Sequence, residues 1–524
     1  MKFCISFLLT LLLIFPANSL PASAQAKGTW RSVRTNNLTV IGNADAESLR
    51  QVAVWLEFFH AAFGRLVSRS VFDASVPTTV VVFRDEASFT PFKPLYQGRP
   101  QNVGGYFQSG EDVNYIVISL DEGQQLPFST AFHEYVHLHL KDNLPGASLW
   151  LNEGLAELYG ALQFSRGEAL LGAPLVHHVG RLRSQELLPL TSLFEIDHSS
   201  PHYNEQEKVG IFYGQSWALV HYLMLGLDGG RQQQFSQFLQ QVSRGETSEK
   251  ALERAFGKTV ELLEEEFQDY VQRGQFSAQR IVSTDNPEAF AATAMQRSAL
   301  SEGEANFYLG DLLLHTNRPI EAEVYFKQAI AAEPNFLPTY AALGQLYAYQ
   351  RRYAEAKKYL ERAAQAPQNY NVHYLYAYAL SREGVSATGH IREYSPEKVA
   401  VMREQLLRAI KLAPKFAPAY HLLALVDLVA DQNLDEALAM ARKATQLEPS
   451  KPGYALLLAH IHARRGNSGE ATTILETLTR NSDAEVRTEA QSLLDSLSRS
   501  GATSSRESAS SRSAVGSALN SEPE

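Results

Sequence analysis

Two histidines four residues apart, with a glutamate beside the first, are the residues of this chain best suited to chemistry. The segment reads His133-Glu134-Tyr135-Val136-His137. Residues four apart on a helix share one face, so both imidazoles can reach the same metal ion. Glu134 then lies next to that ion and can take a proton from a water molecule. The spacing predicts a zinc-dependent hydrolase site with His133 and His137 as ligands and Glu134 as general base.

A hydrolytic zinc site also needs a third protein ligand and an open position. Glu153, within Trp150-Leu151-Asn152-Glu153-Gly154, is the preferred third ligand. Glu157 lies one helical turn further on the same face, where it can accept the outer N–H of a ligating histidine and fix the tautomer of that ring. Because Glu157 would suit a longer spacing from the histidines, the third ligand stays open between these two acids.

The residues around the histidines favour a helix packed in a domain core. They form an apolar stripe of helical period, which comprises Phe132, Tyr135, Val136, Leu138 and Leu140. The alternative is a pair of core histidines beside a surface glutamate, because so short a pattern also arises by chance. The acidic segment after the turn at 141–146 makes the metal site the preferred interpretation. His139 points across the helix and is not expected to be a ligand.

These segments resemble the gluzincin metallopeptidases, in particular the peptidase MA-like group with its pattern HExxH followed by NEGxxE. The segment 150–154 is similar to the Trp-Leu-Asn-Glu-Gly of aminopeptidase N relatives, whose glutamate is the third zinc ligand. Glu157 matches the acid that thermolysin-like enzymes keep beside a ligating histidine. The resemblance implies a thermolysin-like α+β fold, a Zn²⁺ cofactor and hydrolysis of peptide bonds.

A later segment, Tyr213 to Leu223, resembles the aminopeptidase segment that opens with a transition-state tyrosine, with Ser216 in place of its glycine. The resemblance implies that Tyr213 stabilises the oxyanion, and His202 and His221 are weaker candidates for that task. The chain has no Gly-x-Met-Glu-Asn segment, with which aminopeptidases capture a free N-terminus. An endopeptidase is therefore preferred over an exopeptidase.

The N-terminal residues predict export. Residues 1–24 combine Lys2, the apolar run Ile5–Phe15 and a small-residue cleavage site at Ala24, as in a secretory signal peptide. We therefore expect a periplasmic or secreted protein without a stable membrane span after cleavage. The only cysteine, Cys4, lies in this segment, so neither disulfides nor thiolate zinc ligands are expected in the mature chain. The net charge is −10 and no basic cluster occurs, so nucleic acid is not an expected partner.

Residues 25–278 are expected to form the peptidase domain. Strands are predicted at 38–42 and 78–83, a helix at 45–66, and a hairpin from 106–107 and 115–120. In the relatives, an edge strand beside the zinc helix holds extended substrate, and Gly104–Gln108 or Tyr115–Ser119 are the candidates here. The alternative is that both segments are ordinary strands of the sheet. The region 185–276 is mainly helical, and a linker helix is expected at 279–300.

Residues 301–497 repeat themselves with the period of a tetratricopeptide helix pair. Gly310 and Gly344 are 34 residues apart, as are Ala322 and Ala356. Small residues at such positions let paired helices approach closely. We expect four or five repeats in an all-α tetratricopeptide solenoid, with an insertion around 385–396, and a disordered tail at 498–524.

The repeats predict a protein or peptide partner on the array. Four tyrosines of the repeats are expected either to line its concave face or to pack between helices, namely Tyr347, Tyr374, Tyr376 and Tyr378. Signal, zinc site and array together favour an extracytoplasmic zinc endopeptidase whose repeats recruit a substrate or adaptor. The alternative is a non-enzymatic tetratricopeptide scaffold with an inactive zincin platform, although the intact Glu134 speaks against it.

Overall fold

The computed structural model describes residues 28–66, 76–110, 112–120, 128–144, 146–165, 168–204, 206–226, 230–282, 290, 295–366, 368–383, 393–481 and 483–502. The chain divides into two compact units, a first unit Met1–Leu300 and a second unit Ser301–Glu524. The expected signal peptide lies outside the described residues, as does the expected tail beyond residue 502. Within the described ranges, no helix is long and apolar enough to cross a membrane.

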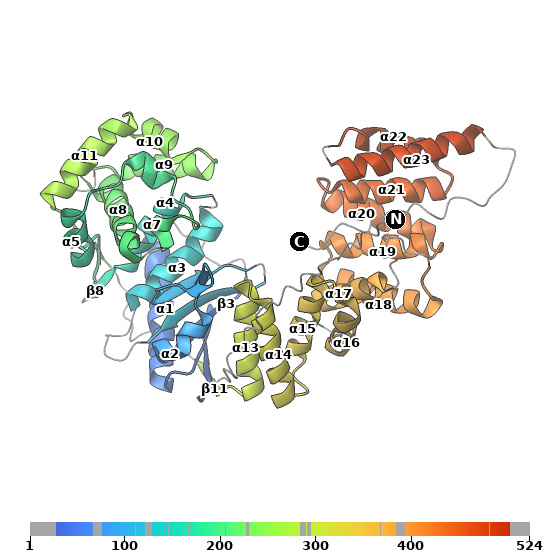
Figure 1. Ribbon diagram of the computed structural model, residues 1–524, viewed down its shortest axis with the longest axis horizontal. Coiled ribbons are helices and arrows are strands. Elements are labelled where there is room, and N and C mark those ends of the chain that lie inside the picture. The colour runs from blue at the N-terminus through green and yellow to red at the C-terminus, as the bar shows by residue number, and fades with distance from the viewer. Residues whose placement is uncertain are drawn as a thin grey trace, which may run out of the picture. The chain divides into compact units, whose positions relative to one another are not determined.

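A six-stranded sheet in the order β11-β1-β2-β3-β7-β6 forms the base of the first unit (Figure 1). Strand β3 pairs in parallel with β2 and with β7, and the remaining pairs are antiparallel. The central strands are buried runs of valine and isoleucine, as expected for parallel strands covered on both faces. The strands are β1 (Arg31–Arg34), β2 (Leu38–Gly42), β3 (Thr78–Phe83), β6 (Gly105–Gln108), β7 (Asn114–Ser119) and β11 (Gln296–Ala299).

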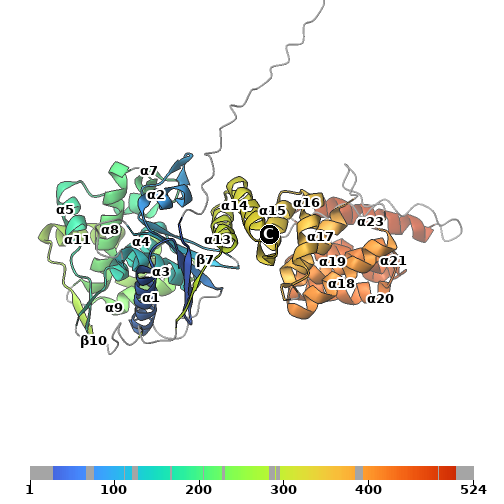
Figure 2. The same cartoon turned by 90° about the horizontal axis from the view of Figure 1, so that it is seen from below.

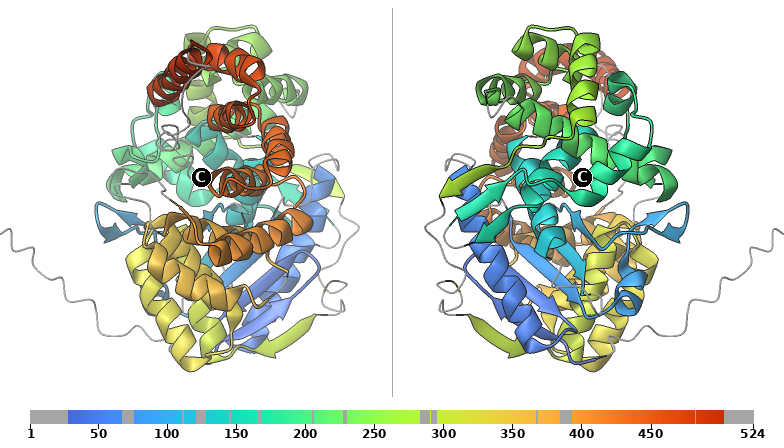
Figure 3. Two further views of the ribbon diagram at one scale, coloured as in Figure 1. Left: turned by 90° about the vertical axis from the view of Figure 1, so that its right-hand side faces the viewer. Right: turned by 90° about the vertical axis from the view of Figure 1, so that its left-hand side faces the viewer.

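Helix α1 (Ala46–Leu66) follows β2 and packs along the sheet (Figure 3). Asp45 caps it by accepting a hydrogen bond from the backbone N–H of Ser48 at 3.0 Å. The predicted strands at 38–42 and 78–83, the helix and the hairpin are thus confirmed. Short elements connect β3 to β6, namely α2 (Glu86–Phe89), η2 (Thr90–Phe92), β4 (Leu95–Tyr96) and β5 (Arg99–Pro100).

The rest of the first unit is mainly helical, and α8 to α11 gather beyond one end of the sheet (Figures 1 and 3). Helix α4 packs between α3 and α8. The helices are α3 (Phe128–Asn143), α4 (Leu149–Gly160), α5 (Val176–Ser184), α6 (Leu190–Phe194), α7 (Pro201–Asn204), α8 (Gln206–Leu225), α9 (Gln232–Ser243), α10 (Ser248–Phe256) and α11 (Val260–Arg273).

The linker helix expected at 279–300 is wrong at its two ends, where the described residues form strands. Residues Gln279–Val282 form β10, which pairs with β9 (Glu168–Leu171) beside β8 (Gln163–Ser165), and residues 296–299 form β11, which pairs with β1. Strand β11 is exposed along its length, so main-chain bonds to β1 hold it rather than a buried apolar face. Because both faces of this strand are exposed, its sequence lacks the alternation of apolar and polar residues that predicts a strand.

The second unit is a series of antiparallel helix pairs that follow one another in chain order (Figures 1 and 2). Five pairs are closed by a terminal helix α23. The helices are α13 (Glu302–His315), α14 (Pro319–Ala332), α15 (Leu337–Tyr349), α16 (Tyr353–Ala363), α17 (Tyr370–Arg382), α18 (Pro396–Leu412), α19 (Ala417–Val429), α20 (Leu434–Leu447), α21 (Pro452–Arg464), α22 (Ser468–Leu478) and α23 (Ala484–Ala502). Helix α23 continues past residue 497, where the tail was expected to begin.

Small residues let the two helices of a pair approach closely, as the repeat period predicts. A Cβ atom on Gly344 would lie 2.6 Å from Cγ of Leu360 in the partner helix, and one on Gly310 would lie 2.8 Å from the Phe326 ring. The expected insertion falls between α17 and α18, mostly outside the described residues. The four tyrosines named above are at most 7% exposed, so they pack between helices.

Candidate metal centre

Two close helix contacts position the site. Helix α4 returns antiparallel to α3 after a short turn and ends against it, because a Cβ on Gly160 would lie 3.0 Å from Cα of His133. On its other side α4 touches α8, where a Cβ on Gly154 would lie 2.4 Å from the carbonyl oxygen of Ser216. Only glycine permits this second approach. The two contacts place the acidic face of α4 beside the histidines of α3.

The three predicted ligands meet in a triangle of donor atoms. His133 Nε2 lies 3.0 Å from His137 Nε2 and 3.2 Å from Glu153 Oε2, and His137 Nε2 lies 3.4 Å from the same oxygen. Zinc with bonds of about 2.0–2.2 Å has ligands roughly 3.4 Å apart in a tetrahedral site. Glu153 is buried, and its Oε2 has no hydrogen-bond partner among the described residues. The donor set therefore fits a zinc ion.

The charges of the cluster also favour a cation. Burial lowers the pKa of His133, but Glu153, Glu157 and Glu134 outweigh burial and raise it to about 10. Burial raises the pKa of Glu153, whereas His137 and His133 hold it below its ordinary value. The site thus stabilises an anionic carboxylate next to two basic nitrogens, which suits a positive ion among them.

The outer nitrogens of both histidines face oxygen atoms. His137 Nδ1 donates to Asn152 Oδ1 at 2.9 Å, and His133 Nδ1 lies 3.5 Å from Glu157 Oε1. This arrangement turns the Nε2 lone pairs toward the triangle and supports the ligating tautomer. The structure thus gives Glu157 the outer position and places Glu153 at the donor triangle. Asn152 was not expected from the sequence, although it belongs to the quoted segment.

Glu134 of α3 is buried next to the edge of the sheet. Burial raises its pKa, while His133, His137 and the backbone of Phe107 on β6 lower it, and burial dominates. Strand β6 is the edge strand beside α3. Strand β7 lies between β3 and β6, so the expectation that Tyr115–Ser119 could hold substrate is wrong, because its main-chain groups already pair on both sides.

Two tyrosines close the site opposite α3. The ring of Tyr213 lies 6.4 Å from that of His133, and the ring of Tyr203 stacks on Tyr213 at 6.1 Å. Tyr203 also donates from its hydroxyl to Glu153 Oε1 at 3.3 Å. Burial raises the pKa of both phenols, so both remain protonated donors at neutral pH. Tyr203 was not expected from the sequence, because it lies on the short helix α7 and belongs to no motif.

The other histidine candidates have different contacts. His221 donates from Nε2 to the carbonyl of Gly172 at 3.0 Å and accepts from the Tyr270 hydroxyl at 2.8 Å, so both of its nitrogens are used away from the triangle. His139 packs on Phe63. His202 lies on α7, and among the described residues no hydrogen bond or ion pair joins it to the three donors.

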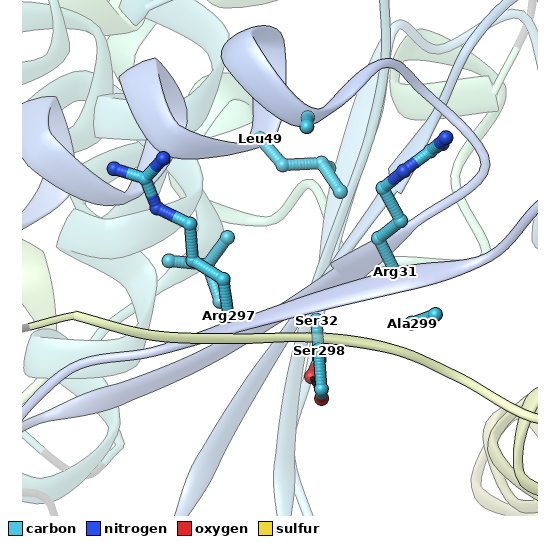
Figure 4. A pocket seen from close by; sticks show the side chains of 8 residues that line it. Arg31, Ser32, Leu49, Arg297, Ser298 and Ala299 are labelled. Atoms are coloured by element: carbon cyan, nitrogen blue, oxygen red, sulfur yellow. Dashed lines mark hydrogen bonds between the residues drawn. The ribbon is translucent and has the colours of Figure 1, made fainter.

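A separate cavity of about 230 Å³ lies where β1 and β11 meet the start of α1 (Figure 4). Arg31 and Arg297 stand at its sides, and the hydroxyls of Ser32 and Ser298 lie 2.8 Å apart. None of the candidate site residues lines this cavity. It is therefore distinct from the metal centre.

Comparison with known proteins identifies the repeats. A family model described as Tetratricopeptide repeat matches residues 428–497, and a second of the same description matches residues 337–370. Both segments lie in the second unit, which therefore contains tetratricopeptide repeats. No curated protein matches the chain.

Solved structures resemble part of the chain, and two of the following three are described as TPR proteins. YrrB, described as a TPR protein with an unusual peptide-binding site, is 19% identical with a TM-score of 0.31, over 36% of this chain and 91% of YrrB. MamA from Desulfovibrio magneticus RS-1 is 19% identical with a TM-score of 0.28, over 38% of this chain and 96% of its own. A thermophilic TPR protein of Thermus thermophilus is also 19% identical with a TM-score of 0.28, over 37% of this chain and 98% of its own.

Proposed function

We propose that this chain is an extracytoplasmic zinc-dependent endopeptidase whose tetratricopeptide array recruits a protein substrate or adaptor. The two halves of this proposal have different support. The family matches back the array, and tetratricopeptide repeats are suited to binding proteins or peptides. The peptidase rests on the metal centre, and the location rests on residues 1–24.

The donor triangle is the observation that carries the peptidase proposal. Two imidazole nitrogens and one carboxylate oxygen converge within 3.4 Å of one another, and the carboxylate oxygen is buried without a hydrogen-bond partner among the described residues. Three protein donors leave one position for water, as in catalytic zinc sites, whereas structural sites close the fourth position with a side chain.

The residues around the triangle have complementary roles. A bound zinc ion supplies Lewis-acid polarisation of water and of the substrate carbonyl. Glu134, whose pKa burial raises, takes the proton from the attacking water and delivers it to the leaving amine. Tyr213 donates its hydroxyl to the developing oxyanion, and Tyr203 holds Glu153 in place from the other side. An extended substrate pairs with the edge strand β6.

The test separates chemistry from metal binding. Glu134→Gln keeps the shape beside the metal but removes the base, so zinc content should stay that of the wild type while cleavage of a broad peptide library falls about 100-fold or more. Glu249→Gln, an exposed glutamate on α10, is the matched control and should change neither quantity. Full cleavage by the Glu134 variant would refute the mechanism.

A second function has its own support, namely a protein-binding scaffold without catalysis. The family matches fall on the array alone, and this finding favours the scaffold over the enzyme. On this alternative, the wild type cleaves nothing in the library and His137→Ala leaves capture of a protein partner unchanged. Turnover that is abolished by His137→Ala decides for the peptidase.

A further inference from the structure

Three potential metal ligands lie together next to the centre described above. Glu157, His177 and His178 each present a ligand atom, and these atoms lie within 4.8 Å of one another. Glu157 comes from α4, and the two histidines form the first turn of α5. We infer that these residues form a second, weaker transition-metal site that shares Glu157 with the first centre.

The fixed half of this second site is the pair His178 and Glu157. His178 is 5% exposed, and its Nε2 lies 3.0 Å from Glu157 Oε2. Its ring packs on Trp217 at 5.9 Å, and its Nδ1 has no hydrogen-bond partner among the described residues. Packing thus holds the His178 ring in place beside Glu157. With this carboxylate as its polar contact among the described residues, the ring is positioned to act as a metal ligand.

The adaptable half is His177. Its ring centroid lies 4.1 Å from that of His178, and its side chain is exposed to solvent. The three ligand atoms lie within 4.8 Å of one another, and rotation of the exposed His177 side chain can bring them to the roughly 3.4 Å between ligands of a tetrahedral zinc ion. Two imidazoles and a carboxylate suit zinc, nickel and copper. The rotation and the exposure make this site weaker than the first.

The shared carboxylate links the two sites. Glu157 Oε1 lies 3.5 Å from His133 Nδ1, while its Oε2 faces His178. A cation at the second site draws the negative charge of Glu157 away from His133. Because an outer carboxylate typically changes metal affinity by about 10–100-fold, excess metal should weaken the first centre. This regulatory consequence rests on the proposed function, whereas the second site itself does not.

Metal titration of the untagged, chelator-stripped full chain tests the inference. We expect calorimetry with zinc chloride to show a tight step and a weaker step for the wild type. His177→Ala should remove the weaker step and preserve the tight one. His198→Ala, another exposed histidine of the first unit whose ring packs on Tyr203, should preserve both.

His137→Ala distinguishes the two proposals. It should abolish the tight step and leave the step that depends on His177, so loss of the first centre does not remove the second. A wild type that shows the tight step but no weaker step at any zinc concentration, or a weaker step unchanged by His177→Ala, overturns the inference. A missing tight step alone contradicts the proposed peptidase and leaves the second site standing.

Discussion

At the scale of single residues, the difference between Glu153 and Glu157 is one of position on a shared helix face. Both are acids on α4, one turn apart, and the sequence allows either to hold the metal. Glu153 Oε2 reaches both ligating nitrogens, at 3.2 and 3.4 Å, whereas Glu157 faces the outer nitrogen of His133. The orientation of α4 against α3 and α8 determines which of the two acids faces the donor nitrogens.

The first prediction compares these two acids. Glu153→Gln removes a donor from the triangle and should reduce zinc affinity by at least about 1,000-fold, because the site loses both a charge and a ligand. Glu157→Gln should reduce it only about 10–100-fold, the usual effect of an outer partner. Competition with a chromophoric chelator measures both. If Glu157→Gln reduced zinc affinity more than Glu153→Gln, Glu157 would be the metal ligand and Glu153 the outer partner.

A second residue-scale prediction concerns acid stability. Burial lowers the pKa of His221 from 6.5 to about 4, so the folded state resists protonation at this residue while the unfolded chain accepts it. The stabilisation from neutral His221 is therefore complete above pH 6.5 and is lost as the pH falls toward 4. The loss is on the order of 3 kcal/mol.

Urea unfolding of the wild type and His221→Gln at pH 7.5 and pH 4.5 checks this expectation. The variant should be less stable at pH 7.5, because it replaces a packed ring, but it should lose less stability on acidification. The comparison isolates His221, since the other titrating groups are common to both proteins. If both proteins lost the same free energy of unfolding on acidification, the lowered pKa of His221 would be contradicted.

At the scale of elements, the contact between α4 and α8 determines where the acidic face of α4 lies. Gly154→Ala would place a Cβ 2.4 Å from the Ser216 carbonyl, so one helix must shift. We expect a loss of about 1–3 kcal/mol in the free energy of unfolding and weaker zinc binding, because Glu153 moves with α4. Thermal unfolding and zinc affinity measure the two effects.

Gly180→Ala is the control for this substitution. Gly180 lies within α5, and a Cβ there would meet nothing within 4 Å. Because alanine favours helix over glycine, this variant should gain about 0.5–1 kcal/mol and bind zinc like the wild type. If both alanine variants behaved alike, the α4–α8 contact would not position the ligand.

At the scale of the whole molecule, the end of the first unit is set by two strands. Strands β10 and β11 lie after α11; β10 is an edge strand of the three-stranded sheet and β11 is an edge strand of the six-stranded sheet. A chain that ends at Arg273 lacks both strands, whereas one that ends at Leu300 keeps them. The division of the chain between Leu300 and Ser301 follows from these pairings.

We expect residues 1–300 to fold, bind zinc and cleave short peptides, because every proposed ligand lies in this unit. This truncated protein should capture a protein substrate less well than the full chain, because it lacks the array that is proposed to raise the local substrate concentration. Residues 1–273 should melt earlier and resist limited proteolysis less. Undiminished capture by residues 1–300 would instead place recognition in the first unit.

The sequence by itself determined the features that depend on local spacing, within one helix or from one repeat to the next. The spacing of His133 and His137, the helical stripe around them and the 34-residue period of the array follow from local geometry. The buried strand at 78–83 is likewise indicated by its composition. Family matches confirm the repeats, while the zinc function stays a prediction.

Only the tertiary structure decided which distant groups meet. Tyr203 reaches Glu153 across 50 residues of chain, and His178 reaches Glu157 across 21. The exposed strand β11 joins the sheet through main-chain bonds to β1, far earlier in the sequence. Such contacts depend on how helices rotate and pack and on backbone groups common to all residues. For that reason no local pattern of side chains encodes them.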